Sequence, residues 1–328
     1  MPHVGCPHLC AFCDQRTISG EEKAPKAEDV RRICLQALDE VASPENAEIA
    51  FFGGSFTAIR RGYMLSLLDA ANEFVGIGRF KGIRISTRPD YIDDEILSLL
   101  KAKNVTAIEL GAQSLDDEVL LANERGHSCE DVVRASELIK SFGFELGLQM
   151  MVGLYKSNEQ KELDTMRKII SIRPATVRIY PVVILKGTKL GTLFLSGEYK
   201  PMEFDEVVSL CAQMLREFDE NGIKVIKCGL HASEFVERDM VGGFYHPAFR
   251  ELCEAECYKS LFEREIAKSG LTDCSAEFLV PKRELSKALG QKKSNIKYFN
   301  DKGIKIKITP SDDLDEKLRV VNIWQIGK

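Results

Sequence analysis

The chain has 328 residues and no run of about 18 apolar residues, so the sequence offers no candidate transmembrane helix. The amino terminus also lacks the basic and then apolar stretch of a signal peptide, and carries cysteines and histidines instead. No internal repeat or low-complexity tract is evident, which excludes a solenoid. We therefore expect a cytoplasmic globular protein that does not bind a membrane.

The composition is otherwise ordinary, with 44% hydrophobic and 29% charged residues, enough for one large core and a smaller module. The formal net charge of -5 gives no general attraction to nucleic acid. The chain contains ten cysteines, which a reducing cytosol keeps as thiols. We therefore read them as metal ligands or buried side chains rather than as a disulfide framework.

Between residues 26 and 228, short apolar runs alternate with amphipathic stretches, which is the pattern of βα units. Such a pattern favours a parallel sheet, open or closed into a barrel. The expected strands are Ala47–Phe52, Ile83–Ser86, Ala107–Leu110, Glu145–Met150, Val177–Pro181 and Lys224–Lys227. The expected helices are Ala27–Val41, Arg61–Phe74, Asp93–Ala102, Cys129–Ser141, Glu159–Ser171 and Phe204–Asn221.

Polar residues and glycines stand where several of these strands end. Gly53, Gly54 and Ser55 follow one strand, Gln113 follows another, and Gln149 lies at the end of a fourth. Barrel-type sheets place their chemistry at the carboxyl ends of the strands, so we expect these residues to meet there.

The βα rhythm stops after about residue 229, and a helix is expected at about Ala248–Lys268. We therefore divide the chain into a barrel domain (1–228), a connecting helical segment (229–270) and a small basic α/β module (271–328).

Three cysteines near the amino terminus have the spacing C-x3-C-x2-C: Cys6, Cys10 and Cys13, with the aromatic Phe12 before the last. A [4Fe–4S] cluster takes one thiolate on each iron when the protein supplies every ligand, so three cysteines leave one iron open. S-adenosylmethionine can chelate that iron through its amino and carboxylate groups. The motif therefore predicts a [4Fe–4S] cluster that delivers one electron to the sulfonium.

The three cysteines could instead form a zinc site with His3 or His8 as fourth ligand, or remain thiols without a metal. Zinc is less favoured, because it prefers paired C-x2-C knuckles and none is present. A second metal site at Cys253, Cys257 and Cys274 is conceivable, but buried helix cysteines are the commoner outcome.

Several motifs in order resemble the radical S-adenosylmethionine superfamily, and within it the radical domain of the Elongator catalytic subunit. They are FFGGSF at 51–56, ISTRPDY at 85–91, ELGAQS at 109–114, RGH at 125–127, IYP at 179–181, KGT at 186–188 and GEYK at 197–200. The likeness covers roughly residues 4 to 228 and implies a partial (β/α)6 barrel. It also implies a [4Fe–4S] cluster and S-adenosylmethionine at the carboxyl ends of the strands.

The resemblance assigns roles to individual residues. Gly53 and Gly54 match the loop that binds the methionine amino group, where the absence of a side chain lets the backbone approach the ligand. Ser55, Gln113, Arg125 and Gln149 match positions that contact the methionine or ribose part, and Phe12 joins this cofactor-binding set.

Some positions depart from the family pattern. Ser86 stands where the Elongator family has a glutamate, and residues 153–156 replace a Gly-Leu-Pro-Gly turn. The acetyltransferase domain of the Elongator subunit has no counterpart here. Only five residues precede Cys6, so we expect the first strand to be very short or to lie outside this sequence.

Residues 271–310 carry nine lysines or arginines against four acidic residues. The expected elements are a strand at Glu277–Val280, a helix at Pro281–Leu289, a tight loop, a capped helix at Ser294–Phe299 and a strand at Ile304–Ile308. This βααβ order resembles the core of a KH domain, whose Gly-x-x-Gly loop clamps a nucleic-acid backbone. The candidate RNA-binding loop is Gly290, Gln291, Lys292 and Lys293.

The sequence thus favours radical-based modification of RNA, with tRNA as substrate and a flavodoxin or ferredoxin as electron donor. Radical chemistry on a small metabolite or porphyrin is a second reading. A third is an iron–sulfur RNA-binding regulator without turnover, and for the basic module a structural cap remains the alternative to RNA binding.

Overall fold

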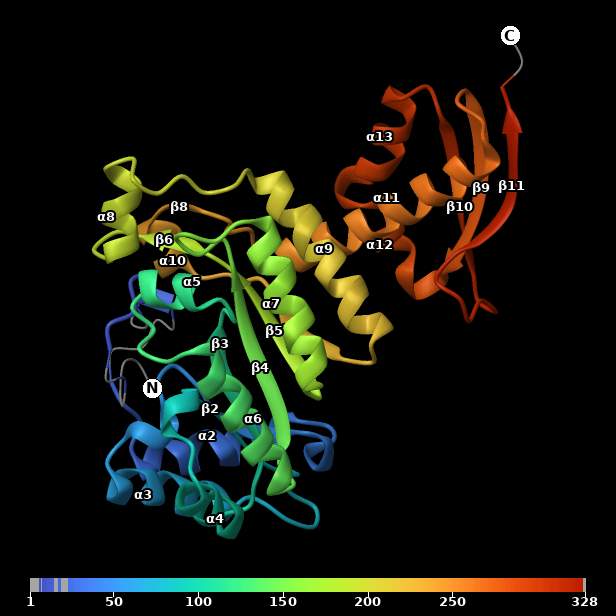
Figure 1. The fold of residues 1–328 in the computed structure, drawn as a ribbon. Helices are drawn as coiled ribbons and strands as arrows, with labels where there is room; N and C mark the ends of the chain where they lie inside the picture. The colour runs from blue at the N-terminus through green and yellow to red at the C-terminus, as the bar shows by residue number, and fades with distance from the viewer. Residues whose placement is uncertain (1–5, 7, 15–16, 19–22, 327–328) are drawn as a thin grey trace. The chain divides into compact units, whose positions relative to one another are not determined.

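The structure is a computed structural model that describes residues 6, 8–14, 17–18 and 23–326 (Figure 1). The first strand expected before Cys6 falls outside the described residues. The chain forms two compact units, one of residues 1–202 and 221–245 and one of residues 203–220 and 246–328. The domain boundaries expected at residues 228 and 270 stay a proposal.

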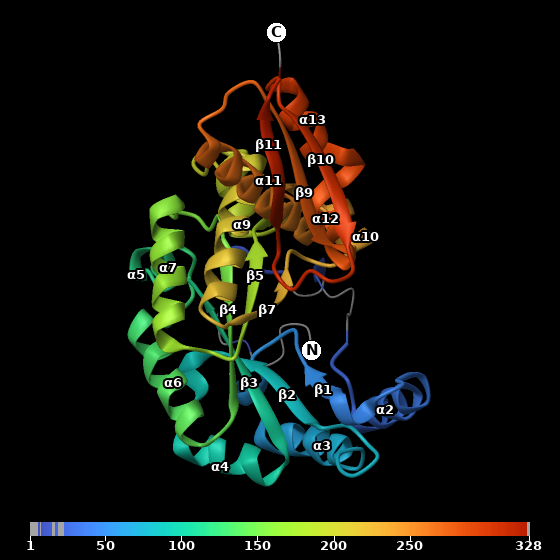
Figure 2. The same ribbon diagram turned by 90° about the vertical axis from the view of Figure 1, so that its right-hand side faces the viewer.

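The first unit is built on a sheet of six parallel strands in the order β1-β2-β3-β4-β5-β7. The sheet curls into a half-barrel, which confirms the expected fold class (Figures 1 and 2). Its strands are β1 Glu48–Phe51, β2 Gly82–Thr87, β3 Val105–Gln113, β4 Glu145–Val152, β5 Thr176–Pro181 and β7 Lys224–Cys228.

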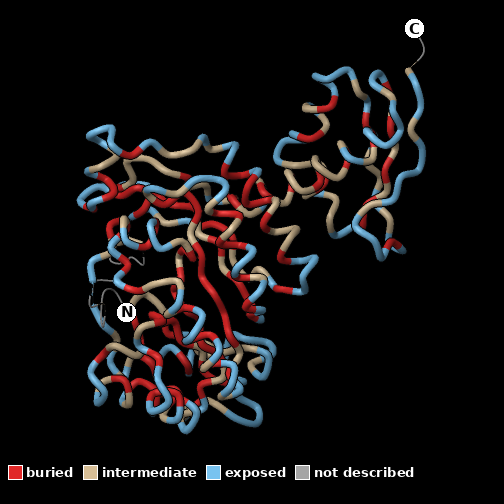
Figure 3. Tube along the Cα trace, in the orientation of Figure 1, coloured by how far each residue is buried: buried red, intermediate tan, exposed pale blue. Residues whose placement is uncertain are grey.

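Helices of this unit pack outside the sheet (Figure 2). They are α2 Ala27–Glu40, α3 Arg61–Asn72, α4 Asp94–Ala102, α5 Asp117–Ala122, α6 Cys129–Ser141 and α7 Glu159–Ile172. Local sequence fixes where several begin: the Asp93 side chain accepts from the backbone N–H of Ile96, and Ser128 forms a capping box with Asp131. Six of the eight residues of β4 are buried, as expected for a parallel strand covered on both faces (Figure 3).

Besides α5, four short elements of this unit were not anticipated. Strand β6 (Val183–Leu185) pairs antiparallel with β8 (Met240–Gly243), and helices α8 (Lys189–Leu195) and α10 (Glu234–Asp239) lie near them in sequence. Gly243 must be glycine in this pairing, because its φ is 93° and a Cβ would lie 2.4 Å from the carbonyl oxygen of Val182.

The second unit contains α9 Phe204–Glu220 and α11 Phe249–Ser269, followed by β9 Cys274–Pro281, α12 Leu285–Leu289, α13 Ser294–Asp301, β10 Lys305–Ser311 and β11 Arg319–Gln325. Strand β9 is central, parallel to β10 and antiparallel to β11. Alternate residues of β9 are buried, and Phe278 packs with Phe262 and Phe299 in the core of the unit.

The βααβ order expected for residues 277–308 is present, with two corrections. The helix expected at Pro281–Leu289 is a 3-10 turn at Lys282–Glu284 and then the short α12. No side chain caps α13, because Ser294 is its first helical residue and Lys293 precedes it. Strand β11 was not anticipated, and it completes a three-stranded sheet.

No helix in the part of the chain that the structure describes is long and apolar enough to cross a membrane.

Candidate active site at the carboxyl ends of the strands

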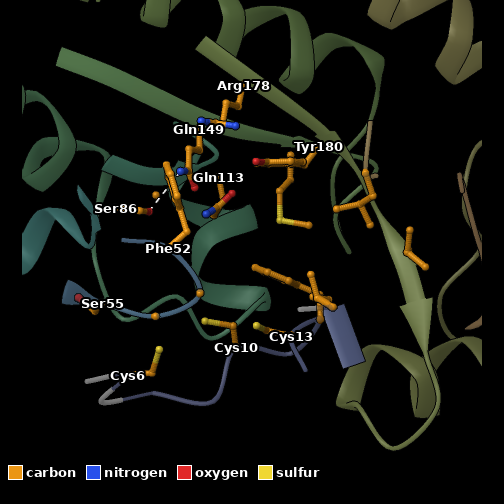
Figure 4. A pocket seen from close by; sticks show the side chains of 18 of the residues that line it. Cys6, Cys10, Cys13, Phe52, Ser55, Ser86, Gln113, Gln149, Arg178 and Tyr180 are labelled. Atoms are coloured by element: carbon orange, nitrogen blue, oxygen red, sulfur yellow. Dashed lines mark hydrogen bonds between the residues drawn. The ribbon is translucent and has the colours of Figure 1, made fainter. Parts of the chain in front are cut away.

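A cavity of about 500 Å³ opens in the first unit at the carboxyl ends of the sheet strands (Figure 4). The cysteines lie at one end of this cavity, and Arg178 lies at the other. Every residue predicted to bind a cofactor lines the cavity: Cys6, Cys10, Phe12, Cys13, Gly53, Gly54, Ser55, Gln113, Arg125 and Gln149. The expected convergence of sequence-distant motifs is therefore seen in the structure.

The cysteine segment is fixed to the barrel through the residues between its thiols. The backbone N–H of Ala11 donates to the carbonyl oxygen of Asn123 at 3.1 Å, and the carbonyl oxygen of Ala11 accepts from Leu190 N–H at 2.7 Å. Ala11 and Phe12 are buried, whereas the three cysteines are half-buried. The thiols are thus held at the cavity while the backbone between them is anchored.

Arg125 joins this segment to the barrel. Its Nη1 donates to the Cys10 sulfur at 3.0 Å, and its Nη2 donates to the carbonyl oxygen of Gly111 at 2.6 Å. The guanidinium also lies 6.0 Å from the centroid of the Phe12 ring.

The thiol of Cys6 has a pKa above its ordinary value, mainly because it is partly buried. The described residues include no group of three His, Cys, Asp or Glu side chains arranged to hold one metal ion, at either cysteine cluster. A four-iron cluster does not require such an arrangement, since each thiolate binds a different iron. Cys274 of the other cluster packs in the hydrophobic core of the second unit.

The glycine loop after β1 is tied to the end of β2. Gly53 has a φ of 96°, which favours glycine. The Ser55 hydroxyl is buried, bonds the Thr87 hydroxyl at 3.0 Å and accepts from the N–H of Arg88 at 3.3 Å. Ser55 therefore positions the loop, and Gly53 and Gly54 present backbone to the cavity.

Two groups at the cavity have unmet hydrogen-bonding capacity. The Oε1 atom of Gln113 and the Nε atom of Arg125 are buried without a partner, although buried polar atoms are normally paired. Gln113 also has a φ of 67°, which a glutamine rarely adopts. An unpaired acceptor and an unpaired donor beside three thiols fit a polar ligand such as S-adenosylmethionine.

Two hydrogen bonds orient the side-chain amide of Gln149. Its Nε2 donates to Glu109 Oε2 at 2.9 Å and to the Ser86 hydroxyl at 3.2 Å, so the side-chain oxygen Oε1 is the group left for a ligand. Glu109 is 1% exposed and also accepts from Arg178 Nε at 2.6 Å. The sequence reasoning missed Arg178 and Lys227 as site residues. The sequence signal available was a charged residue inside each of two expected strands, Val177–Pro181 and Lys224–Lys227.

The loop 290–293 lies between α12 and α13 of the second unit. Gly290 has a φ of 70°, and a Cβ there would lie 2.2 Å from the Ser294 hydroxyl oxygen. Lys292 and Lys293 also have positive φ values, 50° and 60°. Both side chains are exposed, and neither forms an ion pair with any residue that the structure describes.

The sequence profile of the radical SAM superfamily matches residues 1–169, just over half of the chain. The chain belongs to this superfamily. The C-terminal domain profile of radical SAM proteins matches residues 174–259. Membership implies a [4Fe–4S] cluster and S-adenosylmethionine, and it identifies an enzyme family.

Relatives agree with the resemblance seen in the sequence. A tRNA uridine(34) acetyltransferase of Methanocaldococcus infernus is 28% identical over 55% of this chain and 38% of its own length. Human Elongator complex protein 3 is 28% identical over 53% of this chain and 35% of its own. The chain thus spans well under half of these relatives. Archaeal Elp3 from M. infernus, with an N-terminal deletion, shares the fold at a TM-score of 0.55 and 22% identity, covering 75% of this chain and 59% of that one.

The side chain of His127 provides a test of the packing beneath the site. It is buried, its Nε2 lies 3.2 Å from the carbonyl oxygen of Ala112, and its pKa is lowered to about 4 by burial and then by Arg125 and Arg88. An unfolded histidine takes up its proton near pH 6.5. Because the pKa is lower in the folded protein, protonation of His127 favours the unfolded chain. The free energy of unfolding is therefore unaffected by His127 above about pH 6.5 and falls by about 3 kcal/mol as the pH drops toward 4.

We therefore expect His127→Gln to lose this dependence. Urea unfolding of the cluster-free wild type and variant at several pH values measures the free energy of unfolding of each protein. The difference between the two proteins isolates the contribution of His127, because Glu162, which has the opposite effect, is present in both. Burial raises the pKa of that carboxyl to about 7, so it favours the folded state at low pH. If the free energy of unfolding changed equally in the two proteins between pH 7 and 4, the lowered pKa of His127 would be contradicted.

Proposed function

We propose that this chain cleaves S-adenosylmethionine reductively to methionine and a 5′-deoxyadenosyl radical, and that the radical modifies RNA, with tRNA as the substrate. The observation that carries the proposal is the single cavity that joins three cysteines, a glycine loop and the unpaired polar atoms of Gln113 and Arg125. When bound, the [4Fe–4S] cluster supplies one electron to the sulfonium, and three cysteine ligands leave one iron open.

The chain's own residues would bind and orient the reactants. Cys6, Cys10 and Cys13 would hold the cluster as thiolates, and their protons would leave on ligation. Arg125 Nη1, which donates to the Cys10 sulfur at 3.0 Å, would orient that ligand. Gly53 and Gly54 would let backbone groups reach the methionine amino end, and buried Phe12 would exclude water from the cysteine loop.

RNA as the substrate class is supported by the basic module of residues 271–328, which lies within the second unit. Lys293 stands where a Gly-x-x-Gly loop has its second glycine, and it adopts the positive φ that a glycine would take there. The loop therefore has the positive-φ conformation that a glycine favours, although the residue is lysine. Lys292 and Lys293 add positive charge that can pair with phosphates. The relatives named as tRNA uridine(34) acetyltransferases support tRNA in particular.

The cleavage requires one electron from outside the chain. We propose a flavodoxin or ferredoxin as the donor, since these one-electron carriers have the low potentials that the step needs. The cysteines of the described chain are thiols, which accords with the reducing cytoplasm that we propose as its compartment.

The test is formation of 5′-deoxyadenosine from S-adenosylmethionine by cluster-loaded protein reduced with dithionite. We expect Arg125→Ala to weaken binding of S-adenosylmethionine about tenfold while keeping the iron, because one hydrogen bond involving a charge is worth about 1.5–3 kcal/mol.

The matched control is Arg134→Ala, which removes an exposed guanidinium of α6 that pairs only with Asp131 among the described ion pairs. No 5′-deoxyadenosine from reduced, cluster-loaded protein in the presence of tRNA would overturn the enzymatic proposal and favour a regulator without turnover.

A further inference from the structure

One wall of the cavity lies away from the cysteines and is formed by neighbouring strands. Gln149 of β4 is the register partner of Arg178 of β5, and Arg178 is the register partner of Lys227 of β7. Partners in adjacent strands point to the same face of a sheet, and all three line the cavity. Arg178 and Lys227 therefore present two cationic side chains next to each other.

The cavity lining contains no aspartate or glutamate among the described residues. Ser86, where the sequence resemblance calls for a glutamate, lines the cavity and is 9% exposed. At this position the chain thus lacks the carboxylate that the resemblance calls for. The space beside Gln149 is correspondingly more favourable to an anion.

Arg178 is held in place for such a role. Glu109 accepts from its Nε at 2.6 Å and from its Nη2 at 3.1 Å, the Phe52 ring lies 4.8 Å from the guanidinium carbon, and the Tyr180 hydroxyl bonds the same side chain. Glu109 is buried behind the wall, so it balances the charge of Arg178 without entering the cavity.

Lys227 is different, because it forms no ion pair or hydrogen bond with any residue the structure describes. Its ammonium is the charge of this wall that no carboxylate compensates. A half-buried lysine without a partner is costly unless a ligand pairs with it.

We propose that Lys227, with Arg178 beside it, binds a phosphate or carboxylate group of the molecule that the radical attacks. The inference rests on the proposed radical chemistry in the same cavity and adds the chemical class of the second ligand. The site is distinct from the one expected for the methionine carboxylate. That group is expected to chelate the open iron at the cysteines, which lie at the opposite end of the cavity from Arg178.

Acetylation of lysine side chains by a small reagent tests the proposal without turnover. Cluster-loaded protein with S-adenosylmethionine is treated alone, with inorganic phosphate, with acetate or with tRNA, and the rate at each lysine is read by peptide mass spectrometry. Lys224 is the internal control, since it is exposed at the amino end of the same strand.

We expect at least one anion to slow acetylation of Lys227 fivefold or more and to leave Lys224 unchanged. Protection by phosphate and tRNA would assign the anion to a nucleic-acid phosphate, and protection by acetate would assign it to a small acid. Equal rates at Lys227 with and without all three anions would overturn the proposal.

A pair of variants adds a second readout. Ser86→Glu places the missing carboxylate in the cavity, and it should raise the anion concentration needed for half-protection of Lys227 by on the order of tenfold. Ser86→Gln is the neutral control of the same size and should behave as wild type. Identical protection in the two variants would contradict the proposal. Failure of the proposed function itself would appear separately, as absent 5′-deoxyadenosine.

Discussion

Protein reconstituted anaerobically with iron and sulfide is expected to bind about four irons and four sulfides, and the triple variant Cys6→Ala, Cys10→Ala, Cys13→Ala is expected to bind essentially none. The effect should be complete because the three thiolates are the only protein ligands proposed for the cluster. Iron and sulfide analysis and the broad visible absorption of the cluster measure it.

The matched control changes two other half-buried cysteines, Cys129 and Cys257, to alanine and should keep the full iron content. Its purpose is to separate ligation from general loss of thiols. If the triple variant kept its iron, the ligand assignment would be wrong, and zinc or a different ligand set would have to be considered.

Much of the barrel could be predicted because its signals are local. Each parallel strand is an apolar run between turn residues, and several helices carry their own capping residues and an apolar face. The expected strand at Glu145–Met150 is observed as Glu145–Val152, and the helix expected at Cys129–Ser141 has those bounds. The predicted site residues lie close together because they follow parallel strands, whose carboxyl ends meet at one edge of the sheet.

The parts that were missed depend on contacts between distant segments. Strands β6 and β8 have 3 and 4 residues, and only their mutual pairing makes them strands. Strand β11 has mostly exposed residues, so its sequence carries little alternation to detect. Ser294 is a common capping residue, but positive φ at Lys292 and Lys293 shifts the helix start so that Ser294 is already helical.

Arg178 and Lys227 could not be assigned to the site from the sequence for the same reason. Lys227 lies in β7, far in sequence from the motifs, and only the register with β5 places it beside Arg178. Ser86 could be recognised as a departure from the sequence alone. Its consequence for the cavity's charge required knowing that Glu109 is buried behind the wall rather than lining it.

The double variant Lys292→Asp, Lys293→Asp is expected to weaken tRNA binding roughly twentyfold at about 0.1 M salt and to flatten the salt dependence. Each phosphate neutralised on a single strand contributes about -0.7 to the slope of log affinity against log salt, so losing two contacts should reduce the slope by roughly 1 to 1.5. The loop should keep its shape, because aspartate tolerates positive φ better than lysine does. Electrophoretic mobility shifts at several salt concentrations measure both quantities.

The control is Lys81→Asp with Lys224→Asp, which makes the same change in net charge at exposed lysines near the amino ends of β2 and β7. Those ends face away from the carboxyl-end cavity, and neither lysine belongs to the second unit. A long-range effect of net charge would weaken tRNA binding equally in the two double variants. If the loop binds tRNA specifically, tRNA affinity should fall only in the variant with changes at Lys292 and Lys293. Unchanged tRNA affinity and salt slope in that variant would mean that the basic module of residues 271–328 is a structural cap, and radical chemistry on a small molecule would become the favoured function.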